Sequence, residues 1–571
     1  MAAHLDGTPY VSPDLPAPDR RWDEIADVVV VGYGAAGSVA AIEAADAGAR
    51  VTVIDRWSRG GASARSGGII YAGGGTPQQV AAGFADTPEQ MAEYLAVEEA
   101  IPRDDPVLHA FCERSRDDLA WLEQLGVRFG TRFDPTKSVT PTDDAVGLYF
   151  SGNEKHHAAQ GPPVPRGHRV AGAGMTGRDL VATLHIGARR RGVTVRSRTR
   201  LTDLVVDDAG RVVGVEALVL GRDPLSRFGH ALLYRVVDAI AALAHRVPPV
   251  LVRACDRFER RHSRPVRIGA RSGVVLATGG FSYAHDLVVG HAPAYRGALP
   301  LGTPGDDGSG IEIAHGIGAA LRSMDRCGAS RFIAPPLGFC SGVLVDPAGE
   351  RICDESLYAA TLSARIAERG GRAWLVVDGA IRDGIAEEIH RSPRLRDRPL
   401  RQLIGGRANA VIFPRVFGTI NLRLNRILAP DLDSLARRCR LPVAALRRTI
   451  DVYNASAVAG TADEMGKSAD MVRPLLRPPF AAVPCHLDGV VFPAPCITLG
   501  GLDVDGMTQE VRRPDGTVIA GLHAVGRSAF GIASHSYVSG LSLADCVFSG
   551  RNAGRALVAD RRDLRVPGGS N

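Results

Sequence analysis

The sequence lacks several features that would place it in a specialised class of protein. Its 571 residues contain no run approaching the roughly 20 apolar residues of a membrane-spanning helix, which excludes a transmembrane protein. The first residues are acidic and rich in proline, without the apolar core of a signal peptide, so we expect a flexible arm over residues 1–21 and a cytoplasmic protein. The nine cysteines include no CxxC pair, which argues against a disulfide framework or a zinc site, and no metal is required.

Lysine is scarce among the 68 basic residues, a bias that we attribute to coding usage and to which we give no functional weight. Glycine, by contrast, is abundant, with 66 residues that gather in clusters such as GYGAAG, GGASARSGG and ATGG. Glycine lets the backbone turn tightly and approach a ligand closely. The clusters therefore predict a large ligand that carries phosphate groups.

Basic charge is concentrated in residues 221–271, which contain eleven arginines and four acids. Apolar residues at helical spacing precede the Pro248-Pro249 pair, and an arginine-rich helical stretch follows it, which predicts a helical-hairpin insertion. The simplest interpretation is a hairpin packed on its own protein with a solvated basic face. Attachment to anionic lipid and an oligomer contact are the alternatives. A nucleic-acid partner is disfavoured because the sequence has no groove-reading motif.

The strongest motif starts at a β-branched run, Asp27 to Val31, which predicts a strand buried on both faces. Three glycines in the spacing GxGxxG follow it, in the order that permits a tight turn, lets a pyrophosphate approach the backbone and lets a helix pack on the strand. A second strand, Val51 to Ile54, leads to Asp55, a carboxylate placed to bind a ribose hydroxyl. Together these elements predict a dinucleotide-binding unit.

Later motifs favour FAD over NAD. A second glycine-serine loop, GGASARSGG, follows Arg56 where an NAD enzyme would usually continue its doubly wound sheet. Another buried strand, SGVVLATGG over residues 272–280, comes after a strand and hairpin over residues 193–215. In this order the motifs resemble the flavoprotein superfamily of fumarate reductase and 3-ketosteroid dehydrogenase, over about residues 25–560. The resemblance implies FAD, and no covalent attachment is indicated.

The resemblance implies an α/β fold in which a discontinuous, Rossmann-like FAD-binding domain carries an α+β cap for the substrate. The FAD-binding domain would comprise residues 22–298, including the insertion, and 482–571, and the cap residues 299–481. The matching motifs imply the following FAD contacts: Gly32, Gly34, Ala35, Ala36, Gly37, Asp55, Arg56, Ala62, Ser63, Ser66, Gly67, Gly68, Leu201, Ala277, Thr278, Gly279, Asp307, Gly526, Arg527, Ser542 and Leu543.

Three positions distinguish the branches of this superfamily. The dicarboxylate reductases grip their substrate with two arginines and a histidine, and the matching positions here are Ala359, Tyr537 and Cys496. A dicarboxylate would find no cationic or imidazole partner at these positions.

Hydroxyl groups are present instead. Tyr358, Tyr537 and Ser539 match the tyrosine, tyrosine and serine of the 3-ketosteroid Δ4-(5α)-dehydrogenases, whereas the Δ1-dehydrogenases lack the serine. The resemblance implies that Tyr537 and a nearby backbone N–H polarise the ketone, that Ser539 and Tyr358 remove the α-proton, and that FAD takes the hydride. Tyr149 and His535 are further candidates.

We therefore expect an enzyme that introduces a double bond next to the 3-keto group of a steroid, at Δ4-(5α) in preference to Δ1. Its partners would be a steroid-like small molecule and an electron acceptor that the sequence does not identify, and the oligomeric state is not indicated. Two alternatives stay open at this point: a fumarate or enoate reductase of the same superfamily, and a flavin-binding protein without turnover.

Overall fold

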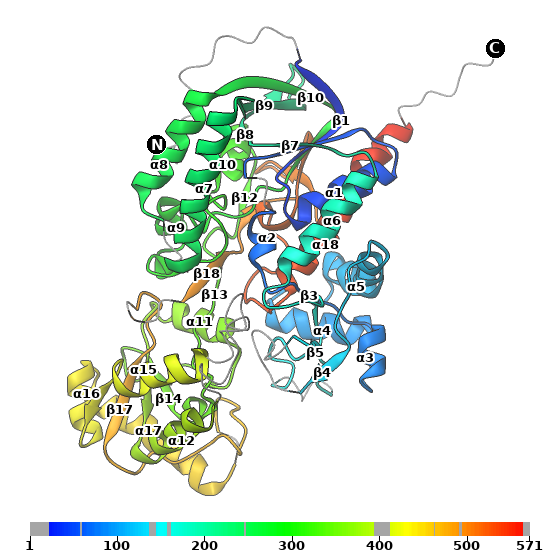
Figure 1. The fold of residues 1–571 in the computed structure, drawn as a ribbon. Helices are drawn as coiled ribbons and strands as arrows, with labels where there is room; N and C mark the ends of the chain where they lie inside the picture. The colour runs from blue at the N-terminus through cyan, green and yellow to red at the C-terminus, as the bar shows by residue number, and fades with distance from the viewer. Residues whose placement is uncertain are drawn as a thin grey trace, which may run out of the picture.

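The computed structural model of the chain has a mixed α/β fold built on one large, mainly parallel sheet with four smaller sheets around it (Figure 1). The predicted arm over residues 1–21 lies outside the described residues. No described helix is long and apolar enough to cross a lipid bilayer. The structure describes residues 22–57, 60–135, 144–156, 162–244, 247–392, 412–461, 463–489, 491 and 494–563.

The central sheet has the strand order β20-β21-β10-β1-β2-β7, and β8 and β9 extend it along β10. All pairs from β21 to β7 are parallel, while β9 runs antiparallel to β10. The two strands predicted around the GxGxxG motif are thereby confirmed as its centre. The strands are β1 (Glu24–Val31), β2 (Val51–Asp55), β7 (Thr194–Ser197), β8 (Thr199–Val206), β9 (Val212–Leu220), β10 (Ser263–Leu276), β20 (Glu510–Arg512) and β21 (Val518–Ala524).

Helices from both ends of the chain pack against one another beside this sheet. Helix α1 (Ala35–Asp46) lies between α6 (Gly177–Arg190) and α18 (Leu541–Asp563) (Figure 1). The contact with α18 is close because Gly550 and Gly554 face α1, where an added Cβ would lie 2.8 Å from the carbonyl oxygens of Ala36 and Ala40 respectively. Two segments that are distant in sequence thus complete one layer, as the resemblance implied.

A small sheet of order β3-β6-β5-β4 lies beside the start of α18. The amide of Tyr71, at the end of β3, donates a hydrogen bond to the carbonyl of Gly540, just before α18, at 3.1 Å. The elements of this region are α2 (Gly61–Arg65), β3 (Ile69–Tyr71), α3 (Pro77–Ala81), α4 (Pro88–Glu98), α5 (Pro106–Gln124), β4 (Arg132–Asp134), β5 (Val146–Tyr149) and β6 (Gly167–Arg169).

The predicted helical hairpin is confirmed. Helix α7 (Pro224–Ala244) and helix α8 (Pro249–His262) are inserted between β9 and β10, and the prolines Pro248 and Pro249 separate them. Figure 1 shows the two helices side by side at the upper left.

A separate lobe, at the lower left of Figure 1, is built on the antiparallel sheet β14-β15-β17-β16. Before and after it in sequence, β11, β13 and β18 form one sheet and β12 pairs with β19, so the chain enters and leaves the lobe through paired strands. The exact division into domains stays a prediction. The strands are β11 (Leu299–Pro300), β12 (Leu321–Arg322), β13 (Cys327–Ala329), β14 (Val343–Val345), β15 (Trp374–Val377), β16 (Ile427–Ala429), β17 (Phe480–Pro484), β18 (Pro495–Thr498) and β19 (Gly501–Leu502).

Helices of this second half pack around these sheets. They are α9 (His285–His291), α10 (Ser309–Gly316), α11 (Ala359–Glu368), α12 (Gly379–Arg391), α15 (Gly418–Arg423), α16 (Leu432–Cys439) and α17 (Val443–Ala459). Short 3-10 segments cover Pro293–Tyr295, Leu337–Ser341 and Gly526–Ser528, and a π-helical turn covers Ile412–Phe417.

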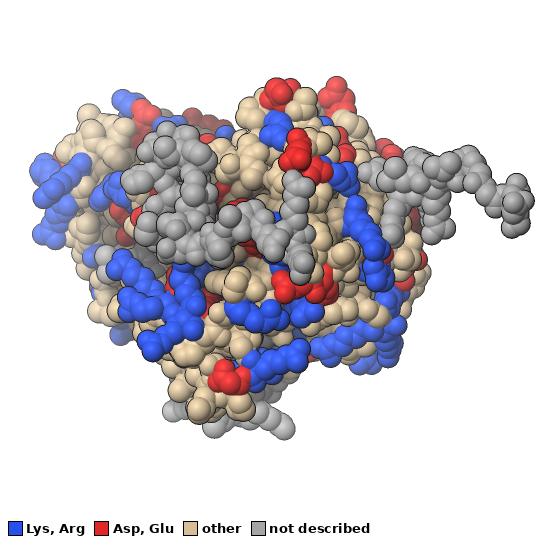
Figure 2. Space-filling model, turned by 90° about the horizontal axis from the view of Figure 1, so that it is seen from above, with Lys and Arg blue, Asp and Glu red and all other residues tan. Residues whose placement is uncertain are grey.

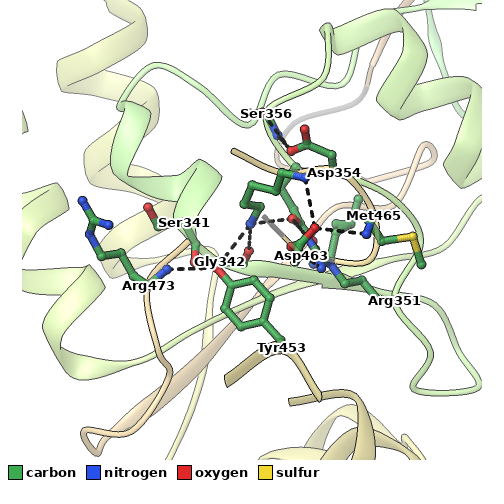
Figure 3. Close-up of polar contacts among 12 residues, drawn as sticks. Ser341, Gly342, Arg351, Asp354, Ser356, Tyr453, Asp463, Met465 and Arg473 are labelled. Carbon is green, nitrogen blue, oxygen red and sulfur yellow. Dashed lines mark hydrogen bonds and ion pairs between the residues drawn. The ribbon is translucent and has the colours of Figure 1, made fainter. Parts of the chain in front are cut away.

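A buried ion network holds the lobe together below the loop that leads to α11 (Figure 3). The Nζ of Lys467, which is fully buried, lies 2.6 Å from Glu355 Oε2 and donates to the Gly342 carbonyl at 2.8 Å. The guanidinium of Arg351 pairs with both Glu355 and Asp463. A buried charge is tolerated only when it is paired. The network thus fixes the residues just before Tyr358.

We expect Gly37→Ala to destabilise the fold by about 3 kcal/mol or more, because strain at a packed site cannot relax. An added Cβ at Gly37 would lie 2.0 Å from the carbonyl oxygen of Gly32, so α1 would have to move away from β1. Gly290→Ala in α9 is the matched control, since nothing lies within 4 Å of its added Cβ. The melting temperature should fall only for the first variant, and equal melting of both would contradict the packing argument.

Candidate active site

The loop between β1 and α1 has the geometry that a pyrophosphate needs. Gly32 adopts a φ of +102°, and an added Cβ would lie 2.3 Å from the carbonyl oxygen of Ala277. Gly34 caps α1, and its neighbour Ala35 donates its amide to Ser63 Oγ at 3.1 Å. The predicted turn and close helix packing are therefore present, and backbone amides at the start of α1 border the loop, where a phosphate is favoured.

Asp55 stands at the end of β2, next to this loop. Its carboxylate accepts hydrogen bonds from the amides of Tyr33 and Trp57, both at 2.9 Å. These bonds fix the carboxylate beside the glycine loop, and its contact with a ribose hydroxyl stays a prediction.

Arg56 and Asp307, two of the predicted FAD contacts, bind each other at 3.0 Å. The Arg56 guanidinium also pairs with Asp256 at 2.6 Å and with Glu259 at 3.0 Å, both in α8. Burial lowers the pKa of Arg56, but the carboxylates of Glu259, Asp307 and Asp256 outweigh it and raise the pKa overall. Arg56 thus joins the hairpin to the central sheet. A direct contact of Arg56 or Asp307 with FAD stays a prediction.

The ends of β10 and β21 meet at the same edge of the sheet. The amide of Gly279 donates to Ser528 Oγ at 3.1 Å, and an added Cβ at Gly526 would lie 3.0 Å from Ala36 Cβ. The Nη2 of Arg527 binds Asp306, while its Nη1 is buried and has no hydrogen-bond partner among the described residues. An acceptor group on a ligand would satisfy that nitrogen. This unsatisfied donor and the glycine loop fit a dinucleotide.

The remaining predicted FAD contacts lie around this edge, except one. Leu201 is a core residue of β8. The others lie in and around α2, after β10 and in the first turns of α1 and α18: Ala36, Ala62, Ser63, Ser66, Gly67, Gly68, Ala277, Thr278, Ser542 and Leu543.

The structure brings the three predicted catalytic residues together. Ser539, in the turn before α18, hydrogen-bonds with Tyr149, at the end of β5, and its hydroxyl lies close enough to Tyr358, which caps α11, to affect the pKa of that phenol. The Tyr358 hydroxyl itself is buried and has no hydrogen-bond partner among the described residues. Tyr537 is close to both phenols, and together with burial it raises their pKa. Burial, the largest cause, raises the pKa of Tyr149 and Tyr358 far above the usual range, and the nearby Ser539 hydroxyl partly offsets this. Tyr149, a further candidate in the sequence, is thus part of the same cluster.

Tyr537 faces a backbone donor. The amide of Gly540 hydrogen-bonds with its hydroxyl, and burial still raises the Tyr537 pKa to about 12 against the lowering effects of Arg527 and of this bond. The ring packs on β13, where an added Cβ at Gly328 would lie 2.7 Å from the Tyr537 Cβ. A phenol and a backbone N–H, the two kinds of donor that form an oxyanion hole, therefore lie next to each other.

The turn that carries these groups is held on both sides by the small sheet. The amide of Ser539 donates to the Ser151 carbonyl at 3.2 Å, and the Gly540 carbonyl accepts from Tyr71. Gly540 has a φ of +95°, and an added Cβ would lie 2.8 Å from the Tyr71 nitrogen. No residue with a side chain fits this position.

Asn153, which sequence reasoning did not single out, positions Tyr358. Its Oδ1 accepts from the Tyr358 amide at 2.6 Å, and its Nδ2 donates to Glu98 Oε1 at 2.7 Å and to Thr361 Oγ1 at 2.8 Å. The Ser536 hydroxyl also donates to Glu98 Oε1, at 3.2 Å. One buried network therefore joins β5, α11 and the turn before α18. The only sequence signal was the LYFSGNE segment that contains both Tyr149 and Asn153.

His535, the other further candidate, contacts a different group. Its Nδ1 lies 3.0 Å from Arg326 Nη1, and burial together with Arg326 lowers its pKa. Its amide donates to Glu99 Oε2 at 3.0 Å, beside the bond from Ser534 at 2.9 Å. His535 therefore belongs to the support of the turn and not to the hydroxyl cluster.

The cations around the hydroxyl cluster are paired with acids. Arg169 and Arg527, whose charges act on Tyr149 and Tyr537, pair with Asp144 and Asp306. The two arginines near the hydroxyl cluster thus have acidic partners, and the carboxylate of Glu154 also acts on Tyr149 and Tyr358. That the cluster binds an uncharged carbonyl compound stays a prediction.

Comparisons with known proteins agree with this geometry. A family model described as FAD binding domain matches residues 27–540. The chain is 32% identical to a 3-oxo-5-alpha-steroid 4-dehydrogenase of Comamonas testosteroni over 89% of its own length and 94% of that protein. It is 26% identical to a fumarate reductase (cytochrome) of Shewanella frigidimarina, over 92% and 76% of the two chains.

A solved structure is also similar. The 3-ketosteroid-delta4-(5alpha)-dehydrogenase of Rhodococcus jostii RHA1, in complex with 4-androstene-3,17-dione, superposes with a TM-score of 0.74 at 32% identity, covering 95% of this chain and 98% of that one.

The buried carboxyl of Glu99 gives a prediction about stability. Burial raises its pKa to about 8, although the amides of His535 and Ser534 lower it. Because the folded pKa lies above the unfolded one, the native state loses stability as the pH rises from about 4.5 towards 8. Glu99→Gln, which stays neutral, should therefore gain several degrees in melting temperature relative to the native chain between pH 5 and pH 9.

The matched control for this measurement is Glu93→Gln. Glu93 is exposed and lies in α4, the helix that Glu99 caps at its C-terminal end. The melting temperature of Glu93→Gln should follow that of the native chain at each pH. If the difference in melting temperature between Glu99→Gln and the native chain did not change with pH, the assignment of a buried carboxyl with a raised pKa would be contradicted.

Proposed function

The chain belongs to the FAD-binding family that includes 3-ketosteroid dehydrogenases and fumarate reductases, and we propose that it oxidises a 3-ketosteroid between carbons 4 and 5. It is an FAD-dependent oxidoreductase of the 3-ketosteroid dehydrogenase type that acts on CH–CH groups, an activity of steroid metabolism. The observation that carries the Δ4-(5α) assignment is the position of Ser539 between Tyr149 and Tyr358, beside Tyr537.

We propose that FAD is held without a covalent bond by the loop of Gly32 and Gly34, by Asp55 and by Arg527. Supporting this are the glycine loop that leaves no room for a Cβ and the buried Arg527 nitrogen that lacks a partner among the described residues. Bound FAD supplies a hydride acceptor, which no side chain can provide.

The first task of the protein is to make a hydrogen next to the ketone acidic. We assign the Tyr537 hydroxyl and the Gly540 amide as the donors to the ketone oxygen, since they lie next to each other. Donors aimed at a developing oxyanion contribute about 3 kcal/mol each to the transition state. An uncharged donor pair suits an uncharged carbonyl, and the turn that carries it is fixed before substrate arrives.

The second task is to remove that proton. We assign Ser539 Oγ as the atom that accepts it from carbon 4 while passing its own hydrogen to the oxygen of Tyr358. A serine is a weak base by itself, so the phenol must be ionised to receive the proton. Tyr149, which hydrogen-bonds with Ser539, would hold the serine oxygen in place during the transfer.

The reductase alternative has no support at the three positions that distinguish it. Ala359, Tyr537 and Cys496 offer no cation, and the buried Arg351 and Lys467 are bound to Glu355. A dicarboxylate would therefore lack the charged partners that it needs.

The first test removes individual hydroxyls. After anaerobic mixing with a saturated 5α-3-ketosteroid, the native protein should bleach the oxidised flavin band. Tyr537→Phe and Ser539→Ala should keep bound FAD but slow the bleaching by about 100-fold or more. Tyr283→Phe and Ser282→Ala remove hydroxyls from the segment after β10 and should bleach at the native rate. Native rates in the first pair would refute the site assignment. Reoxidation of the reduced protein by fumarate, without any bleaching by the steroid, would refute the substrate class.

The second test uses pH. Because burial raises the pKa of Tyr358 well above its usual value, the phenolate fraction should still be rising at pH 10. The rate of flavin reduction, measured by stopped flow, should therefore increase from pH 7 to pH 10 without a plateau. Tyr358→Phe should be slow and should lose this increase. A native plateau near neutral pH that Tyr358→Phe retains would show that another group is the base.

A further inference from the structure

The α7–α8 hairpin directs its acidic side chains towards the body of the protein. Asp256 and Glu259 bind Arg56, and both also pair with Arg200 on β8. Asp238 binds Arg65 of α2. The fourth acid, Asp223, accepts the amide of Ser226 at 2.7 Å at the start of α7. The acids of the insertion are therefore used in anchoring the hairpin and in capping it.

Aromatic stacking reinforces this anchor. The ring of Trp57, two residues after Asp55, stacks on Tyr234 at 4.7 Å and on His230 at 5.5 Å between ring centroids. His230 also lies 3.2 Å from Glu259. The inner face of α7 is thus fixed on the central sheet, which determines the direction of its outer face.

The outer face of α7 is apolar. Leu225, Phe228, Leu232 and Val236 are exposed by 84%, 68%, 53% and 43%. Their spacing of three and four residues places them along one side of the helix. An amphipathic helix on a protein surface normally turns its apolar side towards the core, so this second apolar stripe has no partner within the described chain. Val250, at the start of α8, extends it with an exposure of 69%.

The same hairpin carries exposed arginines. Exposed arginines occur on both helices of the hairpin, and among the described residues they form no ion pair; they are Arg227, Arg235, Arg253, Arg257, Arg260 and Arg261. In Figure 2, which views the molecule from the end that carries the central sheet, basic side chains gather in several clusters. An ordinary solvated surface intersperses both signs of charge. Here three of the four acids bind arginines of the protein body, and the arginines named above are exposed.

We propose that this face of the hairpin docks the protein onto an anionic lipid surface. The apolar stripe would enter the boundary of the acyl chains, while the arginines would lie at the level of the phosphate groups, which guanidinium binds in a bidentate manner. A second copy of the same face would bring arginines against arginines, so self-association through it is disfavoured. Docking of this kind would give access to an apolar substrate dissolved in the lipid, a consequence that rests on the proposed function, whereas the docking itself does not.

The test is co-sedimentation of the full-length FAD-loaded protein with vesicles. We expect partition onto phosphatidylcholine vesicles that contain phosphatidylglycerol to exceed that onto phosphatidylcholine alone by about tenfold or more. Raising the salt concentration from about 0.1 M to about 0.5 M should remove most of this difference, because the charges are exposed. Equal partition onto both vesicles would refute the proposal.

Two sets of substitutions assign the effect to the hairpin. L225S/F228S/L232S should weaken binding to the anionic vesicles by about tenfold, and R253Q/R257Q/R260Q should do the same and reduce the dependence on salt. The matched control for the first set is L424S/V458S, at positions in the lobe that are exposed by 78% and 76%. The control for the second is R116Q/R178Q/R448Q, whose side chains are exposed by 60% to 67%.

Flavin absorbance and the turnover of a dissolved steroid should be native in all these variants, which shows that they are folded. Because turnover is measured without vesicles, failure of docking and failure of the proposed function give different results. Unchanged vesicle binding in both hairpin variants would refute the proposal. A change from dimer to monomer in gel filtration with unchanged vesicle binding would also refute it and would assign the stripe to a second copy of the chain.

Discussion

The tight turn at Gly540 is the constraint on which the candidate site depends. The turn has a positive φ, its carbonyl is bonded to β3, and the preceding residue is bonded to the Ser151 backbone. These contacts leave no room for a side chain at Gly540 and fix where Ser539 and Tyr537 project. Because the turn leads directly into α18, which packs on α1, the hydroxyl groups are set relative to the glycine loop of the dinucleotide site.

Tyr358 reaches the same point from the lobe, and two polar networks hold it there. Behind it, the buried group of Lys467, Arg351, Glu355 and Asp463 ties the approaching loop to β14 (Figure 3). In the second network, Asn153 Oδ1 accepts a hydrogen bond from the Tyr358 amide, and Asn153 Nδ2 donates one to Glu98. A buried network of this kind specifies one arrangement because an unsatisfied member would be costly. Relay of a proton between two hydroxyls needs such fixed positions.

The hairpin shows how one insertion can be joined to a cofactor domain and still offer a new surface. Its acids and aromatic rings are used next to Asp55, at Arg56 and Trp57, so the hairpin is continuous with the dinucleotide end of the fold. What remains on its outer side is mainly arginine and apolar side chains, Phe228 among them. The same division of charge that secures the hairpin thus creates the outward face that we propose as a lipid contact.

The amino-acid sequence alone determined the dinucleotide unit and the helical hairpin, because each is a local pattern: strand, glycine turn and helix in one register, and a double proline between helices. The Tyr-Tyr-Ser set came from the resemblance to the Δ4-(5α)-dehydrogenases, and its catalytic role stays a prediction. Only the tertiary structure decided what surrounds them. Asn153 and Glu98 have no local pattern, and their role arises from contacts between segments more than 50 residues apart. Arg56 follows the ribose-binding position in sequence, yet three acids brought together by folding engage it. Pairing of distant charges depends on which surfaces fold together, and periodicity and spacing along one chain do not contain that information.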